Sequence, residues 1–453
     1  MRYLPAFVLF ICCAPAFAAP HEFSLSSTRI EQLGALAVDA DMTVDGFPDG
    51  NGGSHDVRFK RIDVYAPGAR IIAVGADGER EVPRSARIEL IGSDASGGMR
   101  VHLAFDPGFR NVVGSGSSAS GTFAIGARSD DGGTHLVVRP SEEALPAGVK
   151  PQVIGGDDGV PNPFAPPAPL LALGNDTTTA TPRGAVVAID VDHELLVTRF
   201  GGTAAANQTA AKNWIADLFA TMNVMYVRDL NVTLQVGTTI LRTGATPYTI
   251  AANGNASQTD LANFGTYWQT NYASTPRTFA ALLSGRETDT SHAGFSASGI
   301  AWINSYCRKP SSGGSYSVNK VFTSAQVGVA ISARIVGHEL GHNFGAAHTH
   351  CTSATTGAYP VSSGTIDMCV SGETMNTGSC YSGSATACPA SGPGAPAGTL
   401  MSYCNTIGCG SDHQNVLQFH PAQITTLSAL IAQNAASGCI ASSADLIFRN
   451  GFD

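Results

Sequence analysis

Basic residues are scarce in this chain. Lysine and arginine together number 26 among 453 residues, against 35 aspartates and glutamates, which gives a formal net charge of −9. A protein that binds nucleic acid needs clustered positive charge on one face, so the composition argues against a nucleic-acid partner. Beyond Ala18, no stretch supplies the roughly 18 consecutive apolar residues of a membrane-spanning helix. We therefore expect a soluble protein without a membrane span.

Cysteine is absent from Ala19 to Tyr306, and no two cysteines form a C-x-x-C pair. The missing pair argues against a second metal site held by cysteine sulfur. Two cysteines lie before Ala18 and an even number remains, which indicates disulfides in an exported protein. Their pairing does not follow from the sequence. The remaining cysteines are Cys307, Cys351, Cys369, Cys380, Cys388, Cys404, Cys409 and Cys439.

Residues 1–18 have the features of a secretory signal peptide. Arg2 is followed by an apolar run, and Ala16-Phe17-Ala18 has the small-x-small pattern of a cleavage site. We expect the mature protein to be secreted to the extracellular medium or exported to a periplasm. At the other end of the chain, residues 441–453 form a tail to which we assign no chemistry.

Residues 19–154 are predicted to form a small β-rich N-terminal domain. Apolar residues alternate with others from Met99 to Phe105, which is the period of a strand with one buried face, and a β-bulge is expected at Lys60-Arg61. Residues 155–183 are rich in proline, glycine and threonine, so we expect an exposed linker. Arg183 within it is a candidate processing site.

Residues 184–440 mix strand and helix patterns, which predicts an α+β domain. Apolar residues recur at helical spacing from Ala205 to Met225. Thr323 is followed three residues later by the glutamine of a capping box, so a further helix is expected to start at Thr323 or Ser324. Pro421 is predicted to begin the last helix.

Residues 338–348 carry a zinc-binding pattern within the helix that is expected to start near Thr323. Side chains four residues apart lie above one another on a helix, so His338 and His342 present two imidazoles to one point. Gly345 comes where the helix must stop in the left-handed conformation that glycine tolerates, after which His348 supplies a third nitrogen. Three protein ligands leave a tetrahedral zinc with one open position for water. Glu339 reaches the edge of this site without joining the ligands, as a general base does.

The elongated motif and a downstream methionine turn resemble the metzincin clan of zinc endopeptidases. Residues 299–302 and 338–348 are most similar to the adamalysin (reprolysin) family. Thr349 departs from that family, which usually carries aspartate there, and Met401-Ser402-Tyr403 is closer to the Met-x-Tyr turn of astacins and serralysins. The glycine-rich calcium repeats of serralysins are absent. The resemblance covers roughly residues 184–439 and leaves the N-terminal part out.

This resemblance implies a metzincin-type catalytic domain, in which a twisted mixed sheet carries a zinc-binding active-site helix and a C-terminal helix. It also implies one catalytic zinc ion on the three histidines, with Met401 as the floor under the metal. Tyr403 keeps two interpretations, a stabiliser of the transition state or a buried tyrosine without a catalytic role. A calcium ion near Asp190 or Asp192 is a further expectation.

The chain is therefore predicted to be an exported zinc-dependent endopeptidase that acts on proteins or peptides. Glu339 would take a proton from the zinc-activated water and pass it to the leaving amine. One alternative is an inactive binding or adhesion protein on a metzincin scaffold, against which the complete set of Glu339 and three histidines counts. Another is a zinc hydrolase with a non-peptide substrate. Nothing in the sequence predicts the residue preference beside the scissile bond.

Metzincin precursors often block their zinc with a cysteine, and the N-terminal part of this chain has none. Asp157 or Asp158 is a candidate carboxylate ligand, as in astacin precursors, but the sequence favours a solvent-exposed loop acid at both positions. The N-terminal domain is expected to act as a folding chaperone or as an inhibitor. His350 is expected on the surface or beside the ligands rather than on the metal.

Overall fold

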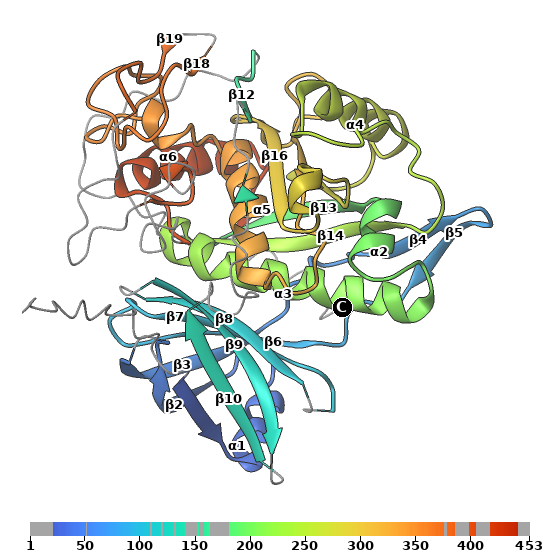
Figure 1. The fold of residues 1–453 in the computed structure, drawn as a ribbon, viewed down its shortest axis with the longest axis vertical. Coiled ribbons are helices and arrows are strands. Elements are labelled where there is room, and N and C mark those ends of the chain that lie inside the picture. Colours follow the sequence, from blue (N-terminus) through green and yellow to red (C-terminus); the bar gives the residue numbers. More distant parts are fainter. Residues whose placement is uncertain are drawn as a thin grey trace, which may run out of the picture.

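The computed structural model describes residues 21–50, 52–108, 111–118, 121–130, 133–140, 152–153, 158–163, 181–375, 378–385, 398–404 and 417–442. The predicted signal peptide, most of the predicted linker and most of the C-terminal tail lie outside these ranges. Within them the chain is a mixed α/β structure with two large sheets (Figure 1). No helix in the described ranges is long and apolar enough to cross a membrane.

The N-terminal part contains an antiparallel sheet of eight strands in the order β1-β10-β9-β8-β7-β6-β3-β2. A short helix, α1 (Ser27–Gly34), follows the first strand and is capped by the Ser26 hydroxyl. The strands are β1 (His21–Leu25), β2 (Asp41–Pro48), β3 (Ser54–Ile62), β6 (Ile88–Ser93), β7 (Arg100–Phe105), β8 (Val112–Ser118), β9 (Gly121–Asp130) and β10 (Gly133–Pro140).

One face of this sheet forms a separate hydrophobic core. Val101, Leu103 and Phe105 of β7 are fully buried in it, together with apolar residues of β3 and β6. This is the alternation that the sequence shows from Met99 to Phe105, because side chains two apart in a strand lie on the same face. The other face of the sheet turns towards the rest of the molecule.

The predicted bulge at Lys60-Arg61 is wrong. Both residues pair regularly with β6, opposite Ile91 and Leu90. The register shift lies in the neighbouring strand β2, between Val44 and Phe47. Gly46 in this stretch has φ of 70°, a conformation that glycine adopts without strain and that commonly accompanies a bulge.

The second sheet is mixed and has ten strands. Its main order is β11-β16-β17-β15-β13-β14-β4-β5, with β12 pairing with β16 and β20 pairing with β13. Strands β13, β14, β15 and β17 run parallel, whereas β16 is antiparallel to β17. The strands are β4 (Ile71–Gly75), β5 (Gly78–Val82), β11 (Gln152–Val153), β12 (Gly159–Val160), β13 (Arg183–Val191), β14 (Val232–Arg242), β15 (Phe279–Ser284), β16 (Ser296–Trp302), β17 (Tyr316–Lys320) and β20 (Ala441–Ser442).

Strands β4, β5 and β11 of the second sheet come from the predicted N-terminal domain, residues 19–154. Strand β4 pairs parallel with β14, from Ile71 opposite Thr239 to Val74 opposite Arg242, and β5 pairs with β4. The β4–β5 hairpin also places Val82 in the same hydrophobic core as β13 and β14. The two predicted domains therefore share one sheet, and their boundaries remain a prediction.

Helix α3 (Ala205–Leu230) lies between the two sheets (Figure 1). It contacts β14 on one side and β6, β7 and β8 on the other. Because it is covered from two sides, its buried residues are not confined to one stripe. The predicted helix from Ala205 to Met225 is confirmed and continues to Leu230, where Asn231 ends it in the left-handed conformation.

Helix α5 (Val329–Phe344) carries the predicted zinc motif. Its predicted start at Thr323 or Ser324 is wrong, because the helix begins after Gly328. The hydroxyl of Thr323 donates to Glu287 and does not cap the helix. A turn separates Thr323 from the first residue of α5. As predicted, the helix ends at Gly345, which has φ of 108°.

The remaining helices are α2 (His193–Thr198), α4 (Gln258–Asn271) and α6 (Pro421–Ala436), the last of which starts at Pro421 as predicted. A short hairpin, β18 (Thr374–Met375) and β19 (Gly378–Ser379), lies in the segment after α5. Cys388 and Cys409 lie outside the described residues. The disulfides that the structure describes are Cys307–Cys439, Cys351–Cys380 and Cys369–Cys404.

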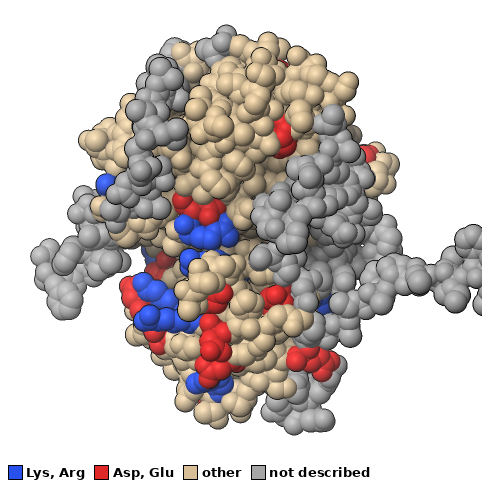
Figure 2. Space-filling view, turned by 90° about the vertical axis from the view of Figure 1, so that its left-hand side faces the viewer, with Lys and Arg blue, Asp and Glu red and all other residues tan. Residues whose placement is uncertain are grey.

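Charged side chains are unevenly distributed over the surface. On the face shown in Figure 2, they gather over the lower half, where the N-terminal sheet lies, and the upper half is nearly free of them. The exposed ion pairs Arg58–Asp41 and Lys60–Asp39 belong to the N-terminal sheet and its connections. Solvent screens such pairs, so their effect on folding stability is small.

Candidate metal centre

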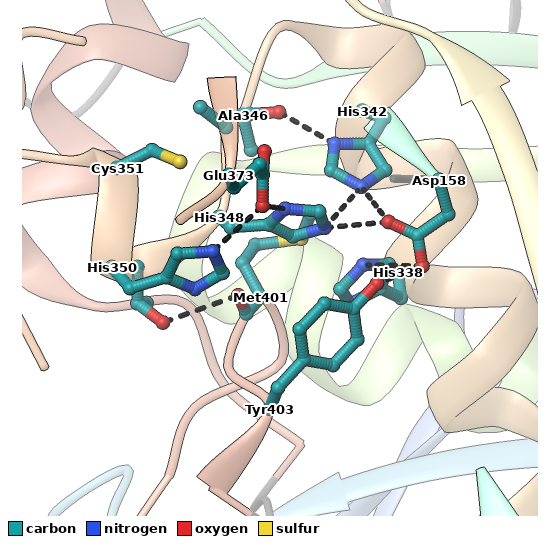
Figure 3. A network of polar contacts seen from close by, with 12 residues as sticks. Asp158, His338, His342, Ala346, His348, His350, Cys351, Glu373, Met401 and Tyr403 are labelled. Atoms are coloured by element: carbon teal, nitrogen blue, oxygen red, sulfur yellow. Dashed lines mark hydrogen bonds and ion pairs between the residues drawn. The ribbon is translucent and has the colours of Figure 1, made fainter. Parts of the chain in front are cut away.

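Three histidine rings meet at the C-terminal half of helix α5 (Figure 3). His338 and His342 come from successive turns, and their ring centroids are 4.7 Å apart. The left-handed turn at Gly345 brings His348 back, with its ring 4.7 Å from His342 and 5.4 Å from His338. The structure therefore brings together the three side chains that the sequence predicts as metal ligands.

Each of these rings is oriented by an acceptor on its Nδ1 atom. His338 donates to the carbonyl of Leu400 at 2.7 Å, and His342 donates to the carbonyl of Ala346 at 2.8 Å. His348 donates to Oε2 of Glu373 at 2.7 Å. Since Nδ1 carries the proton in each ring, each Nε2 is left with a free lone pair.

The free lone pairs point at one small region. Nε2 of His342 and Nε2 of His348 are 3.1 Å apart, and Nε2 of His338 has no hydrogen-bond partner among the described residues. Burial lowers the pKa of His342 to about 4, which keeps that ring neutral. Buried lone pairs that face one another need a cation between them, and three imidazole nitrogens suit zinc. The residues present therefore fit the metal that the sequence predicts, and they could hold it together with Asp158.

Asp158, the residue before β12, faces the three histidines. Its Oδ1 lies 2.6 Å from Nε2 of His348 and 3.4 Å from Nε2 of His342, and its Oδ2 lies 3.8 Å from Nε2 of His338. The residue is only 6% exposed. The expectation of a solvent-exposed loop acid at this position is wrong, and the position expected to hold water is faced by a carboxylate.

Backbone pairing explains why Asp158 lies there. The amide of Ala301 donates to the Asp158 carbonyl at 2.8 Å, and Gly159 and Val160 pair in parallel with β16. A Cβ atom on Gly159 would lie 2.7 Å from Cε1 of His342, so only glycine allows this approach. Sequence patterns do not reveal a two-residue strand such as this one, which is the physical reason that the buried position was missed.

The surroundings of Asp158 favour its charged form. Burial alone would raise the pKa of this carboxyl, but its closeness to the three histidine rings, His348 above all, holds the pKa well below its usual range. The hydroxyl of Tyr403 also donates to Oδ2 of Asp158 (Figure 3). Burial, and then the charge of Asp158, raise the pKa of the Tyr403 hydroxyl, so it remains a donor. Asp157 lies outside the described residues.

Glu339 lies beside the histidines without belonging to the group that could bind a metal. It is 1% exposed, and its Oε2 atom has no hydrogen-bond partner among the described residues. Burial, and then the charge of Asp158, raise the pKa of this carboxyl well above its ordinary value. A Cβ atom on Gly299 of β16 would lie 2.1 Å from Oε1 of Glu339, so glycine makes room for the carboxyl.

Met401 packs underneath helix α5. It is fully buried, and a Cβ atom on Gly341 would lie 2.6 Å from its sulfur. Thr349, which departs from the adamalysin pattern, donates to the Met401 carbonyl from its amide at 3.1 Å and from its hydroxyl at 3.2 Å. These bonds tie the residue after the third histidine to the methionine turn.

Two residues beside the ligands were missed or only partly foreseen. Glu373 carries no motif and lies 25 residues from His348, so no sequence signal identifies it. Its Oε2 atom accepts from Nδ1 of His348 and also from Nε2 of His350, at 2.6 Å. His350 is fully buried, so the prediction of a surface position is wrong. The other prediction, a position beside the metal ligands, agrees with its contact with Glu373.

The expected calcium site near Asp190 or Asp192 is not supported. Asp190 is buried in an ion pair with Arg242, at 2.7 Å, and it accepts from the indole of Trp268. Asp192 caps helix α2 and accepts from the hydroxyl of Ser284. These two carboxylates are thus already occupied by partners within the chain.

The part of the chain that holds these residues matches a family of metallopeptidases. A family model, Reprolysin_5, described as metallo-peptidase family M12, matches residues 181–419, which is more than half of the chain. The crystal structure of metalloproteinase-II from Bacteroides fragilis is similar, with 9% sequence identity and a TM-score of 0.38, over 74% of this chain and 90% of that chain. No curated protein matches the chain.

Proposed function

The chain belongs to metallopeptidase family M12, and on that premise we propose that it is an exported zinc endopeptidase made as a latent precursor. The finer assignment is a metzincin of reprolysin-like type with an astacin-like Met-x-Tyr turn. One observation carries the proposal: each of three buried histidines has its Nδ1 proton on an acceptor, so three Nε2 lone pairs converge. A scaffold that only binds partners has no chemical need for this donor set with a glutamate beside it.

The site residues divide the work of peptide hydrolysis between them. His338, His342 and His348 would hold one zinc ion, which when bound acts as a Lewis acid and makes water a nucleophile near neutral pH. Glu339 is placed to take the proton of that water and to return it to the leaving amine. A raised carboxyl pKa suits both steps, because the group must gain the proton as well as release it.

Tyr403 is proposed as the donor to the oxygen that becomes negatively charged during the reaction. Its hydroxyl lies at the histidine cluster, where it donates to Asp158, and its ring is stacked at 5.7 Å from His338. Once Asp158 leaves, the hydroxyl can donate to a substrate instead. A donor aimed at a developing oxyanion stabilises the transition state more than the ground state.

Latency is proposed to come from Asp158. Its carboxylate occupies the position that a substrate carbonyl or water would need, and the segment it belongs to pairs with β16. A peptide substrate can bind by adding as a strand to the same edge once it is free. The segment from Asp158 to Val160 thus blocks both the ligands and the strand edge.

Export is proposed from the signal-like N-terminus and the disulfides. Cys307–Cys439 and two further disulfides fit an oxidising compartment. N-terminal sequencing and metal analysis of the exported protein would give the maturation point and the metal.

A casein-degradation assay tests the proposed activity. The full-length chain, and the same chain after cleavage of its linker and removal of the N-terminal part, are assayed with and without a chelator. We expect cleavage only by the processed form, its loss with the chelator and its return on adding zinc. A processed protein that contains zinc and leaves casein and a mixed peptide library intact would contradict the proposal.

A further inference from the structure

Glu373 connects the third metal ligand to a second buried histidine. Its Oε2 atom accepts from Nδ1 of His348 at 2.7 Å and from Nε2 of His350 at 2.6 Å (Figure 3). The two rings are stacked with centroids 5.2 Å apart. His350 therefore holds the same oxygen atom that orients His348.

A disulfide-closed loop keeps Glu373 in place. The Cys351–Cys380 bond closes it, the amide of Cys380 donates to the Glu373 carbonyl at 3.0 Å, and the amide of Tyr381 donates to the His350 carbonyl at 3.0 Å. Because the sulfur of Cys351 is committed to this bond, the cluster of Glu373, His350 and Cys351 is not a second metal site.

The three ligands differ in what orients them. Main-chain carbonyls hold His338 and His342, whereas only His348 is held by a side chain. We propose that Glu373 is a positioning residue that fixes His348 for metal binding, supported by His350 and the Cys351–Cys380 loop. The proposal rests on the proposed zinc site. A charged acceptor on Nδ1 fixes the ring and increases the basicity of the opposite nitrogen.

Zinc release from the full-length chain to a chromogenic chelator tests this role. Loss of such an outer partner typically weakens metal binding about 10- to 100-fold, so we expect that loss for Glu373→Ala and partial rescue for Glu373→Gln, which keeps an acceptor. Glu194→Gln, which changes a partly buried glutamate bonded to Arg286, is the control. Wild-type retention of zinc by a folded Glu373→Ala would overturn the proposal, whereas absence of zinc from every variant and from the wild type would overturn the zinc site itself.

A second buried cluster lies where the N-terminal sheet meets helix α3. Glu89 of β6 and His102 of β7 come from the sheet, and Asp217 and Thr221 come from the helix. Nε2 of His102 lies 2.7 Å from Oε2 of Glu89, and its Nδ1 lies 3.1 Å from the Thr221 hydroxyl. Atoms of Glu89, His102 and Asp217 lie within 4.8 Å of one another.

The charges of this cluster do not balance without one more positive charge. Arg87, which lies 3.1 Å from Oδ2 of Asp217, offsets one carboxylate. His102 adds none, because burial lowers its pKa to about 4. Oε1 of Glu89 and Oδ1 of Asp217 receive no donor from the described residues. A proton completes neutrality, whereas a divalent cation would leave an excess charge in a buried place already occupied by the Arg87 guanidinium.

We infer that Glu89 and Asp217 share one proton, and that this proton helps to hold the N-terminal sheet against α3. Burial raises the pKa of both carboxyl groups, which favours keeping a proton on the pair. Nearby Tyr65 stays neutral, since burial raises its pKa to about 12. A carboxyl whose pKa is raised when the sheet and α3 are in contact stabilises that contact fully below its ordinary pKa, near 4.5 for glutamate. This stabilisation is lost as the pH rises towards about 8. Contact between the two parts should therefore weaken towards alkaline pH.

Hydrogen exchange in α3 and β7 of the full-length chain, made with Glu339→Gln to prevent self-cleavage, tests this inference. One linked proton changes an opening equilibrium by up to about tenfold per pH unit. We expect opening to increase from pH 5 to pH 8 relative to a Glu89→Gln variant, which cannot lose the proton, with exposed Glu81→Gln as the control.

Two results would overturn the shared proton. The first is the same pH dependence of exchange in the parent chain and in Glu89→Gln. The second is a slowing of exchange by added zinc, manganese or calcium ions that is lost in Glu89→Gln. That result would mean that a cation, and not a proton, occupies the cluster. If Glu89→Gln does not fold, Asp217→Asn replaces it, with the same expectations.

Discussion

The hydroxyl of Tyr403 donates a hydrogen bond to the carboxylate of Asp158, whose other oxygen faces His348. These two residues are 245 positions apart in the chain and are both buried. The contact joins the proposed inhibitory residue to the proposed oxyanion donor. Each is therefore committed to the other as long as the precursor is closed.

Replacing Asp158 should activate the full-length chain without processing. Asp158→Ala removes the carboxylate from the three histidines, so we expect cleavage of a fluorogenic peptide to rise at least tenfold over the wild-type precursor. Asn162→Ala is the control, since it loosens the same segment by removing bonds to the carbonyls of Asn304 and Gly313. Equal activation by both variants would mean that segment attachment, rather than the carboxylate, maintains latency.

Glu339→Gln should abolish turnover while zinc remains bound. An amide cannot take a proton from water, and loss of a general base typically costs about 10²- to 10⁴-fold in rate. The measurement is kcat of the processed enzyme together with its zinc content. Glu287→Gln, which changes a glutamate that accepts from Thr323, is the control. Undiminished turnover by Glu339→Gln would remove this residue from the mechanism.

Tyr403→Phe should lower kcat of the processed enzyme more than it changes KM. Loss of one donor to a developing oxyanion typically costs about 10²- to 10³-fold in kcat, and the phenyl ring preserves the packing. The precursor of the same variant should also be less completely latent, because Asp158 loses a hydrogen bond. A processed Tyr403→Phe enzyme with wild-type kcat would leave only the structural interpretation of this tyrosine.

Gly299→Ala should displace the proposed base. The new methyl group would lie 2.1 Å from Oε1 of Glu339, so the carboxyl must move and kcat should fall while zinc content is maintained. Gly328→Ala adds the same methyl group at the N-cap of α5, where no atom lies within 4 Å, and should retain activity. Comparable kcat for the two variants would show that the Glu339 position tolerates the shift.

Replacing Cys307 and Cys439 together with serine should destabilise the catalytic part. The bond joins positions 132 residues apart and pins the chain after α6. Loss of a native disulfide typically costs about 2–5 kcal/mol, to be measured as the shift in the denaturant midpoint. The midpoint of the reduced wild type should shift in the same way. If neither midpoint shifts, packing alone stabilises this region and the disulfide contributes nothing measurable.

The metal centre was more accessible to sequence analysis than its surroundings. Local geometry determines where the metal ligands lie. His338 and His342 are one turn apart on α5, and the turn at Gly345 brings His348 back to them. Asp158 and Glu373 reach the same site through a two-residue strand pairing and a disulfide-closed loop. Such long-range contacts leave no periodic signal, and the cysteines could not be paired without the fold.

The fold shows the same division. Long periodic segments such as Ala205 to Met225 were predicted correctly as helix. The start of α5 was placed too early, because the Thr323 hydroxyl donates to Glu287 and does not cap the helix. Local patterns also did not indicate that β4 and β5 belong to the second sheet. Strand β4 pairs with β14, more than 150 residues away, and β5 joins the sheet through β4, which no local pattern reports.

The β4–β5 hairpin has a consequence for how the active enzyme is released. Its main-chain bonds to β14 do not depend on the covalent connection between the two parts. A nick in the segment 164–180 should therefore yield two polypeptides that migrate as one species in native electrophoresis and separate only in denaturant. Liberation of the protease is then a dissociation, governed by an equilibrium constant and by dilution, or else requires a second protease to digest the bound fragment.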